Sequence, residues 1–331
     1  MKLDGSYGEG GGQILRTVLA LSAVTGIPVK INNIRKNRPR PGIAAQHMKA
    51  VEGLASICRA EVRGCSLQST CLDFIPGKLE GGEYHIDIGT AGSIPLLLQC
   101  LMPAAIHATG KILIRITGGT DVSWSPSIDY LGHVTLAALS RMGYNCDIKL
   151  IRRGYYPRGG GCIEAVTRPS SLKAENFDEN TCNIVEGISH SSNLPHHVAE
   201  RQASSAEKIL RLNGFDAVIS TETNNYPSTG SGITLWCGMA GGIALGKRGI
   251  KAEKVGHDAA DAIVLELKSG AGVDIYLADQ LIPYMALAGG GSFTTRAVTP
   301  HTRTNIWVTE QFLDVKFRIE KMDNGLFRIW V

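Results

Sequence analysis

The sequence lacks the long apolar run that a membrane-spanning helix needs. Such a span takes about 20 consecutive apolar residues, and no stretch of the 331 residues approaches that length. The opening residues Met1-Lys2-Leu3-Asp4-Gly5 resemble neither a secretory signal nor a transit peptide. Hydrophobic residues make up 44% of the chain and charged residues 19%, as in an ordinary globular protein. We therefore expect a cytoplasmic globular protein, long enough for more than one domain.

No two cysteines have the CxxC spacing that structural zinc sites use. The eight cysteines are scattered at positions 58, 65, 71, 100, 146, 162, 182 and 237. This spacing argues against a structural zinc site, and in a cytosolic protein it predicts reduced, mostly buried thiols.

The common nucleotide-binding motifs are also missing. No GxGxxG precedes a helix in a convincing βαβ frame. Residues Gly241 to Lys247 fit GxxxxGK, but Arg248 stands where a Ser or Thr would hold Mg²⁺. The segment also follows an expected edge strand, so we interpret it as a chance match. If the protein uses ATP, it binds the nucleotide with another architecture.

Glycine, in contrast, is abundant: 39 of 331 residues, against an average usage of about 7%. One cluster, Gly8-Glu9-Gly10-Gly11-Gly12-Gln13, precedes an expected helix. The free backbone N–H groups of a helix N-terminus favour anions such as phosphate. An acid beside a phosphate makes sense if a cation bridges them, so Glu9 is a candidate ligand for Mg²⁺ or Mn²⁺. The alternative is a tight turn with an exposed acid.

The pattern of helices and strands restarts three times along the chain. First helices are expected near residues 12, 93 and 274, and second helices near 43, 126 and 302. In both series the second interval exceeds the first by about 90–100 residues, which predicts an internal repeat with one inserted module. We predict repeats one and two in residues 1–181, a small inserted α/β domain in 182–270 and the third repeat in 271–331. Strands near 315–318 and 327–330 should finish the chain.

Two further segments suggest chemistry. Pro300-His301-Thr302-Arg303-Thr304-Asn305 is expected to form an exposed, constrained turn, and neutral imidazole is a good nucleophile near pH 7. The alternative is a turn histidine that caps a helix. A basic loop between Lys30 and Arg40 also holds Arg35, Lys36 and Arg38, and arginines suit bidentate contact with phosphate. A solvated surface loop is the alternative there.

Several motifs together resemble the RNA 3′-terminal phosphate cyclase family along essentially the whole chain. They are Asp4-Gly5 with Gly8 to Arg16, Arg38-Pro39-Arg40-Pro41-Gly42 with Gln46-His47, Gly89 to Ser93 with Gln99, Gly118-Gly119-Thr120-Asp121, Gly154 to Gly161, Tyr276 to Leu281, and His301 to Ile306.

The resemblance implies a mixed α/β (α+β) fold. It implies a large domain of three βαβαββ units, each like the C-terminal domain of a translation initiation factor, and a small inserted α/β domain. It also implies an enzyme that uses ATP to convert an RNA 3′-phosphate into a 2′,3′-cyclic phosphate, through enzyme-histidine-AMP and RNA-adenylate intermediates.

The same resemblance assigns roles to residues. His301 corresponds to the nucleophile and Glu9 to the ligand of the divalent cation. Phosphate-side groups are Arg16, Arg38 and Gln46. ATP-binding positions are Gln99, Pro126, Tyr130, Tyr276, Leu277, Ala278, Asp279 and Gln280, with Tyr276 and Pro126 flanking the adenine.

Two other classes remain open. Cyclase-like relatives serve as non-catalytic binding proteins in ribosome biogenesis and lack the nucleophilic histidine, so the presence of His301 argues against that class. Enolpyruvyl transferases share a related repeat fold, but the insert and the His301 segment do not fit them. The partners expected are therefore ATP and an RNA with a 3′-phosphate, with no membrane.

Overall fold

The computed structural model describes residues 1–8 and 10–331, so the predicted cation ligand Glu9 lies outside the described residues. Three of its four-stranded sheets share one architecture. In each, the strands lie in the order first, second, fourth, third along the unit, and only the first two strands run parallel. Each unit reads βαβαββ, which confirms the predicted repeat.

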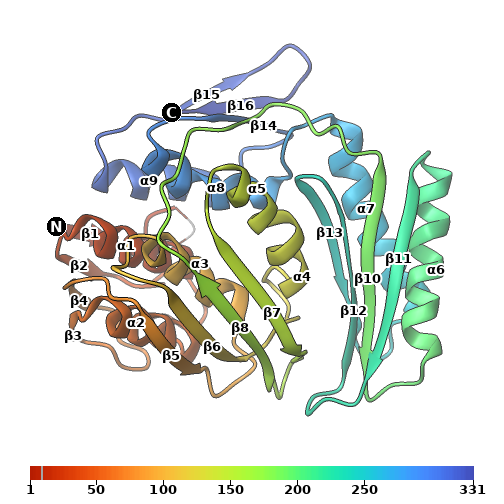
Figure 1. The fold of residues 1–331 in the computed structure, drawn as a ribbon, viewed down its shortest axis with the longest axis horizontal. Helices are drawn as coiled ribbons and strands as arrows, with labels where there is room; N and C mark the ends of the chain where they lie inside the picture. The colour runs from red at the N-terminus through yellow and green to blue at the C-terminus, as the bar shows by residue number, and fades with distance from the viewer. Residues whose placement is uncertain (9) are drawn as a thin grey trace.

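The first two units follow one another without interruption (Figure 1). Unit one comprises β1 (Lys2–Asp4), α1 (Gly12–Thr25), β2 (Val29–Asn32), α2 (Ala45–Cys58), β3 (Glu61–Arg63) and β4 (Leu72–Ile75). Unit two comprises β5 (Gly82–Asp87), α3 (Ile94–Ala105), β6 (Ile112–Gly118), a second helix, β7 (Cys146–Arg152) and β8 (Gly161–Thr167). That second helix contains a π-helical segment, so it is described as α4 (Ile128–Tyr130), η1 (Leu131–Thr135) and α5 (Leu136–Arg141).

The third unit is interrupted by the insert. It comprises β9 (Asn176–Phe177), α8 (Ile275–Ala288), β14 (Ser292–Thr295), α9 (Pro300–Phe312), β15 (Arg318–Lys321) and β16 (Phe327–Trp330). Strand β9 pairs in parallel with β14. The third sheet therefore takes its first strand from residues before the insert, although the third repeat was predicted to begin at residue 271.

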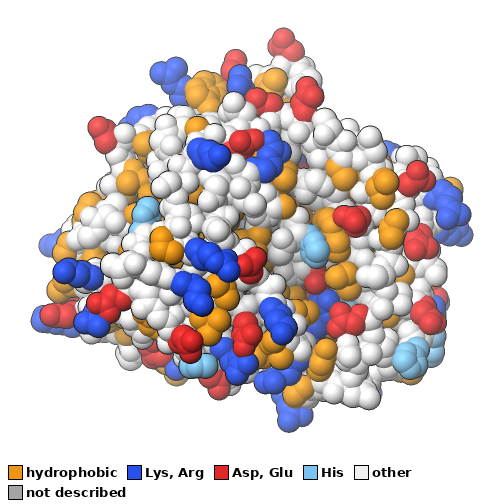
Figure 2. Space-filling view, in the orientation of Figure 1, with side chains coloured by type: hydrophobic (Ala, Val, Ile, Leu, Met, Phe, Trp, Pro, Cys, Tyr) orange, Lys and Arg blue, Asp and Glu red, His pale blue; other side chains and the backbone are white. Residues whose placement is uncertain are grey.

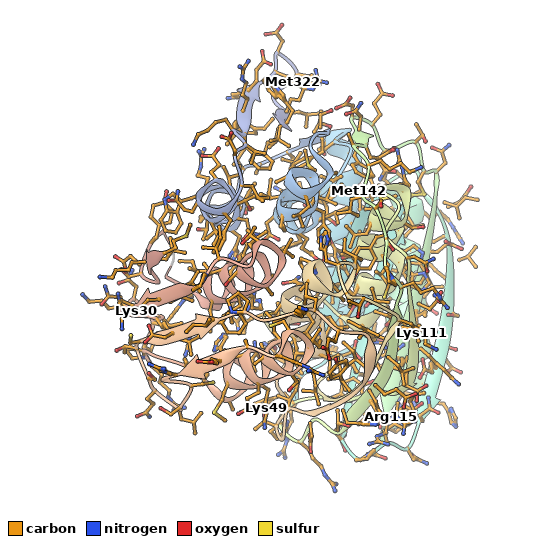
Figure 3. The ribbon with its side chains drawn as sticks, turned by 60° about the vertical axis from the view of Figure 1, so that its left-hand side comes forward. Lys30, Lys49, Lys111, Arg115, Met142 and Met322 are labelled. Carbon is orange, nitrogen blue, oxygen red and sulfur yellow. A yellow bond between two sulfur atoms is a disulfide. The ribbon has the colours of Figure 1, made fainter. Side chains whose placement is uncertain are left out.

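The helices of the three units meet in one hydrophobic core, and the sheets cover it. Helix α1 packs against α2, α3 and α9, and α8 packs against α3 and α9. In β6, Ile112, Ile114 and Ile116 are buried while Arg115 points outward, the alternation of a strand with one face in the core. Lys30 on β2 and Arg115, both labelled in Figure 3, pair on their sheets with Asp73 and Glu164.

The inserted segment forms the fourth sheet, at the right of Figure 1. Its elements are β10 (Ile184–Ser192), α6 (His197–Leu212), β11 (Asp216–Asn224), β12 (Gly230–Cys237), β13 (Ala240–Leu245) and α7 (Ala252–Ser269). Helices α6 and α7 pack together over a separate hydrophobic cluster that includes Leu210, Leu235 and Ile263. The Gly241–Lys247 motif lies largely within edge strand β13, so it does not form a phosphate-binding loop before a helix.

The chain enters and leaves the insert at neighbouring points. The hydroxyl of Thr294 donates a hydrogen bond to the carbonyl oxygen of Asp178 (2.8 Å), and the hydroxyl oxygen of Thr294 accepts one from the N–H of Gly272 (2.8 Å). On its other side the insert contacts unit two, where Trp236 of β12 stacks on His133 of η1 at 3.9 Å between ring centroids. The division into domains at residues 182 and 270 stays a prediction.

Three expectations were wrong. Pro300 to Asn305 were expected to form a turn before a helix, but they form the first turns of α9. The hydroxyl of Thr299 caps this helix by accepting from the Thr302 N–H, and proline fits the first helical position. The strand expected at 315–318 lies at Arg318–Lys321. Cys182 and Cys237 form a disulfide, and of the six free cysteines only Cys58, Cys100 and Cys162 are buried. No helix in the described ranges is long and apolar enough to cross a membrane.

Candidate active site

Helices of the first and third units meet beside His301. The side-chain amide of Gln13, on the first turn of α1, donates to the Asp279 carboxylate of α8 (3.4 Å) and to the carbonyl oxygen of His301 on α9 (3.4 Å). Asn305, one turn after His301, donates to the carbonyl oxygen of Asp279 (2.7 Å) and accepts from Thr17 of α1 (2.8 Å). Two of the predicted site residues, His301 and Asp279, are therefore held together by side chains of α1 and α9.

A small cavity of about 30 Å³ lies between these helices. Its lining residues come from α1, α3, η1, α8 and α9 and include Gln13, Arg16, Gln99, Asp279 and Gln280. A drug-sized ligand needs several hundred Å³, so this cavity has room for a few water-sized groups and not for a nucleotide. The predicted residues Arg16, Gln99, Asp279 and Gln280 thus share one pocket.

The surroundings of the α1 N-terminus are electropositive. Gly11 is the N-cap of α1, no acidic residue lies in the first turn, and the guanidinium of Arg38 lies against Gly11. The pKa of His47 is lowered to about 3, first by burial and then by the positive charges of Arg16 and Arg35. Burial also lowers the pKa of Arg16 from its usual value. Helix α9 likewise has no acid in its first turn. Both helix ends therefore favour an anionic ligand.

The remaining predicted residues divide by accessibility. Tyr276 is 60% exposed at the start of α8, whereas Leu277 and Ala278 are fully buried. Tyr130 is 1% exposed, and its hydroxyl donates to both carboxylate oxygens of Asp274, the N-cap of α8. The structure thus gives Tyr130 a structural contact and no free ring face.

Other predicted groups lie at the start of α3. Gln46 accepts through its side-chain oxygen from the N–H of Ser93, the N-cap of α3 (3.1 Å). Pro126 is half-buried in the loop that follows β6, and the hydroxyl of its neighbour Ser125 hydrogen-bonds to that of Ser93. The basic loop is curled by successive turns, with Arg35 in left-handed backbone and Lys30 already in β2.

A family model described as RNA 3′-terminal phosphate cyclase matches residues 7–319. The chain belongs to the RNA 3′-terminal phosphate cyclase family. Proteins of that name from Methanococcoides burtonii and Methanosarcina barkeri are each 58% identical to this chain. The alignments cover 97% and 100% of this chain, and 97% and 99% of those proteins. A third protein of that name, from Pyrococcus furiosus, is 49% identical over 96% of this chain and 94% of its own length.

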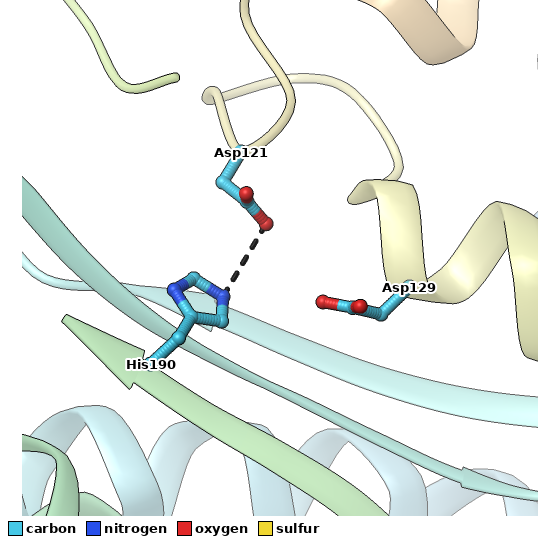
Figure 4. Close-up of side chains that lie close together, drawn as sticks. All are labelled: Asp121, Asp129 and His190. Carbon is cyan, nitrogen blue, oxygen red and sulfur yellow. Dashed lines mark ion pairs between the residues drawn. The ribbon is translucent and has the colours of Figure 1, made fainter. Parts of the chain in front are cut away.

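A buried charge cluster, not predicted from the sequence, lies around Asp121 of the Gly118–Asp121 motif, and Figure 4 shows three of its members, Asp121, Asp129 and His190. Arg153, 1% exposed, donates to Asp129 (2.7 Å), Asp121 (3.3 Å) and Glu222 (3.0 Å), while His190 Nε2 lies 3.3 Å from Asp121 Oδ1. Burial disfavours the charged forms of both Arg153 and Asp121. The neighbouring carboxylates nevertheless hold the pKa of Arg153 above its usual value. His190 and Arg153 likewise hold the pKa of Asp121 below its usual value.

The spacing of Asp121, Asp129 and His190 would suit a metal ion, since one ligand atom from each lies within 4.8 Å of the others. The guanidinium of Arg153, however, already lies between the two aspartates. Asp121 and Asp129 belong to unit two, whereas His190 is on β10 and Glu222 on β11. The cluster is therefore an ion-pair network between unit two and the insert. Its members are far apart in the sequence, so no local spacing could indicate it.

Proposed function

We propose that this chain converts an RNA 3′-phosphate into a 2′,3′-cyclic phosphate in an ATP-dependent reaction. The observation that carries the proposal is the hydrogen-bonded group of Gln13, Asp279 and His301, assembled from three of the motifs that resemble the cyclase family. Support also comes from the names of relatives that match over nearly their whole length.

Three bond exchanges make up the proposed reaction. A ring nitrogen of His301 attacks the α-phosphorus of ATP, so an N–P bond forms and pyrophosphate leaves. An oxygen of the RNA 3′-phosphate then attacks that phosphorus, and the N–P bond breaks. Finally the 2′-OH loses its proton and attacks the 3′-phosphorus, closing the ring and expelling AMP. The covalent intermediate divides one difficult substitution into easier steps.

The chain's own groups reduce the repulsion between anions in these steps. His301 lies at the start of α9, and the positive ends of α1 and α9 favour the phosphates. We assign Arg16, Arg38 and Gln46 to the phosphate groups, and Gln99, Asp279 and Gln280 to ATP. The exposed ring of Tyr276 and the half-buried Pro126 would contact the adenine outside the small cavity.

Glu9 is proposed as the ligand of a divalent cation, Mg²⁺ or Mn²⁺. Such a cation would offset phosphate charge. Glu9→Ala should weaken AMP loading of the enzyme, and added divalent cation should partly restore it. An unchanged dependence on the cation would leave Glu9 as an exposed turn residue.

Incubation with α-labelled ATP tests the proposal most directly. The enzyme should take up label in an acid-labile, alkali-stable bond, as expected of a phosphoramidate. His301→Asn should take up no label and form no cyclic phosphate. The control His85→Asn, a change at an exposed histidine on β5, should take up label and form cyclic phosphate. A chain that binds RNA but never takes up label would be a non-catalytic cyclase-like protein, and label mapped to a lysine would overturn the role of His301.

A second experiment tests the ring-closing step by itself. RNA that already carries a 3′-adenylylated end no longer needs the histidine as a nucleophile. The His301→Asn variant should therefore still release cyclic phosphate from this RNA, slowly, because only the 2′-OH and a positioned leaving group are required.

A further inference from the structure

Trp124 is a free tryptophan held in strained backbone. Its side chain is 99% exposed and its φ is +67°, in the left-handed region that bulky residues rarely adopt. The exposed ring gains nothing from burial, and within residues 1–8 and 10–331 no aromatic ring stacks on it. A residue that combines strain with exposure marks a candidate ligand contact, because strained backbone concentrates at functional sites.

The loop that carries Trp124 is anchored on both sides. Val122 is buried before it, and after it Ser125 hydrogen-bonds to Ser93, while Ser127 caps α4. Since these neighbours are held, the tryptophan is presented at a defined place between β6 and α4, next to the N-terminus of α3. It is two residues from Pro126, which the proposed function places at the nucleotide.

A second free aromatic ring lies on the neighbouring loop. The backbone of Asp121 forms a bridge with Tyr155, and the adjacent Tyr156 is 76% exposed. Arg158 of that loop is also exposed and is steadied by a hydrogen bond to the carbonyl oxygen of Pro227 (2.8 Å). Two aromatic rings and a guanidinium thus project from adjacent loops.

Exposed aromatic rings are rare elsewhere in the described chain. Among its large hydrophobic side chains, the exposed aromatic ones are Tyr7, Trp124, Tyr156 and Tyr276. Tyr7 is already stacked on Trp307, with 3.9 Å between ring centroids. Tyr276 is the ring assigned to adenine above. Trp124 and Tyr156 are therefore two exposed aromatic rings that neither an internal stack nor the proposed adenine contact uses.

We propose that Trp124 stacks on a base of the RNA strand upstream of the 3′-phosphate, with Tyr156 offering a second stacking surface. The inference rests on the proposed function and extends it to the body of the RNA. Single-stranded RNA is commonly held by bases stacked on aromatic rings, which tolerates any sequence. The net charge is only +4, and the face drawn in Figure 2 mixes basic and acidic side chains, so that face offers no broad positive field to hold the strand.

The test compares Trp124→Ala with Trp124→Phe. We would measure the dissociation constant for a 3′-phosphorylated oligoribonucleotide of about ten nucleotides and for a nucleoside 3′-monophosphate. Loss of one stacked base should weaken oligonucleotide binding by about 5- to 150-fold, with most of the affinity retained by the Phe variant. Binding of the nucleoside 3′-monophosphate, which lacks upstream bases, should change by less than about twofold.

AMP loading from α-labelled ATP without RNA separates the alternatives. Trp124→Ala should load AMP with an unchanged KM for ATP, and a raised KM would place the ring on adenine and overturn the proposal. Unchanged oligonucleotide affinity would overturn it as well. Leu212→Ala, which removes another exposed apolar side chain (73%), is the matched control and should alter nothing. A wild-type chain that never loads AMP would instead count against the proposed function.

Discussion

Gly12 at the start of α1 lies directly against the imidazole of His47 on α2. A Cβ at residue 12 would overlap that ring, although the two residues are in different helices. Because His47 is buried and near Arg16 and Arg35, it stays neutral. The contact therefore joins the glycine-rich loop to a neutral ring inside an electropositive site.

Gly12→Ala should destabilise the protein, because the added methyl group overpacks this contact. We expect a loss of about 1–3 kcal/mol in the free energy of unfolding, measured by urea denaturation. Gly132→Ala is the control, since nothing lies within 4 Å of its added Cβ. His47→Ala should partly rescue Gly12→Ala in a double-mutant cycle, and purely additive effects would contradict the overlap.

Gln13→Leu should impair AMP loading more than stability. The substitution removes the amide shared by Asp279 and the carbonyl of His301, so the nucleophile loses a positioning contact. A small misplacement of reacting groups can reduce a rate by about 10- to 100-fold, and single-turnover labelling would measure it. Gln311→Leu, the same substitution at an exposed position on α9, the helix of His301, should have no effect. Equal rates for the two variants would contradict this role of Gln13.

The architecture was largely predictable because its signals are local and repeated. The restarts of the helix and strand pattern indicated three units and an insert. Strand β9 was missed because two residues carry no periodic pattern. The turn predicted around His301 was wrong because proline marks a turn and a helix start alike, and only the cap by Thr299 distinguishes them.

The site was predictable only in part. Motif resemblance assigned roles to Asp279 and His301 and left Gln13 without one. The hydrogen bonds that join the three span 266 and 288 residues and depend on how the units pack. The Cys182–Cys237 disulfide has no CxxC spacing and spans 55 residues. Accessibility was also invisible in the sequence: the run from Tyr276 to Ala278 places one exposed residue beside two fully buried ones.

Stability should depend on pH through Glu266. Burial, then Asp274, raises the pKa of this carboxyl from 4.5 to about 7, although Arg296 donates to it at 2.8 Å. A raised pKa means that the folded state binds the proton more tightly than the unfolded state. The contribution to stability is therefore complete below about pH 4.5 and is lost as pH rises through about 7.

The variant Glu266→Gln isolates this contribution. At about 1.4 kcal/mol for each pKa unit, the stability of the wild type relative to the variant should fall by at most about 3 kcal/mol between pH 4.5 and pH 8. Urea denaturation of both proteins across this range would measure the difference, in which the other titrating groups cancel. A difference independent of pH would contradict the raised pKa.

Counting the reactive thiols tests the Cys182–Cys237 disulfide. Under denaturing conditions without reductant, six thiols should react with a thiol reagent, and after reduction eight should react. Peptide mapping should join Cys182 to Cys237. Eight reactive thiols before reduction would return these two cysteines to the reduced state that the sequence predicted.

Arg153 should be the most sensitive position of the contact between unit two and the insert. Its guanidinium is 1% exposed and is shared by Asp129, Asp121 and Glu222. Arg153→Met keeps much of the side-chain volume but leaves buried carboxylates without their cation. Removal of one partner from a buried network typically costs about 3–5 kcal/mol, because the remaining charges stay desolvated.

The comparison with Arg115→Met makes the test specific. Arg115 pairs with Glu164 on the outer surface of unit two, where it is half exposed, and loss of such a pair costs about 0–1 kcal/mol. Denaturation should therefore separate the two variants by several kcal/mol. Limited proteolysis should cut Arg153→Met faster around residues 178–183 and 270–272, where the chain enters and leaves the insert. Similar losses in both variants would show that the buried network adds no more than a surface ion pair.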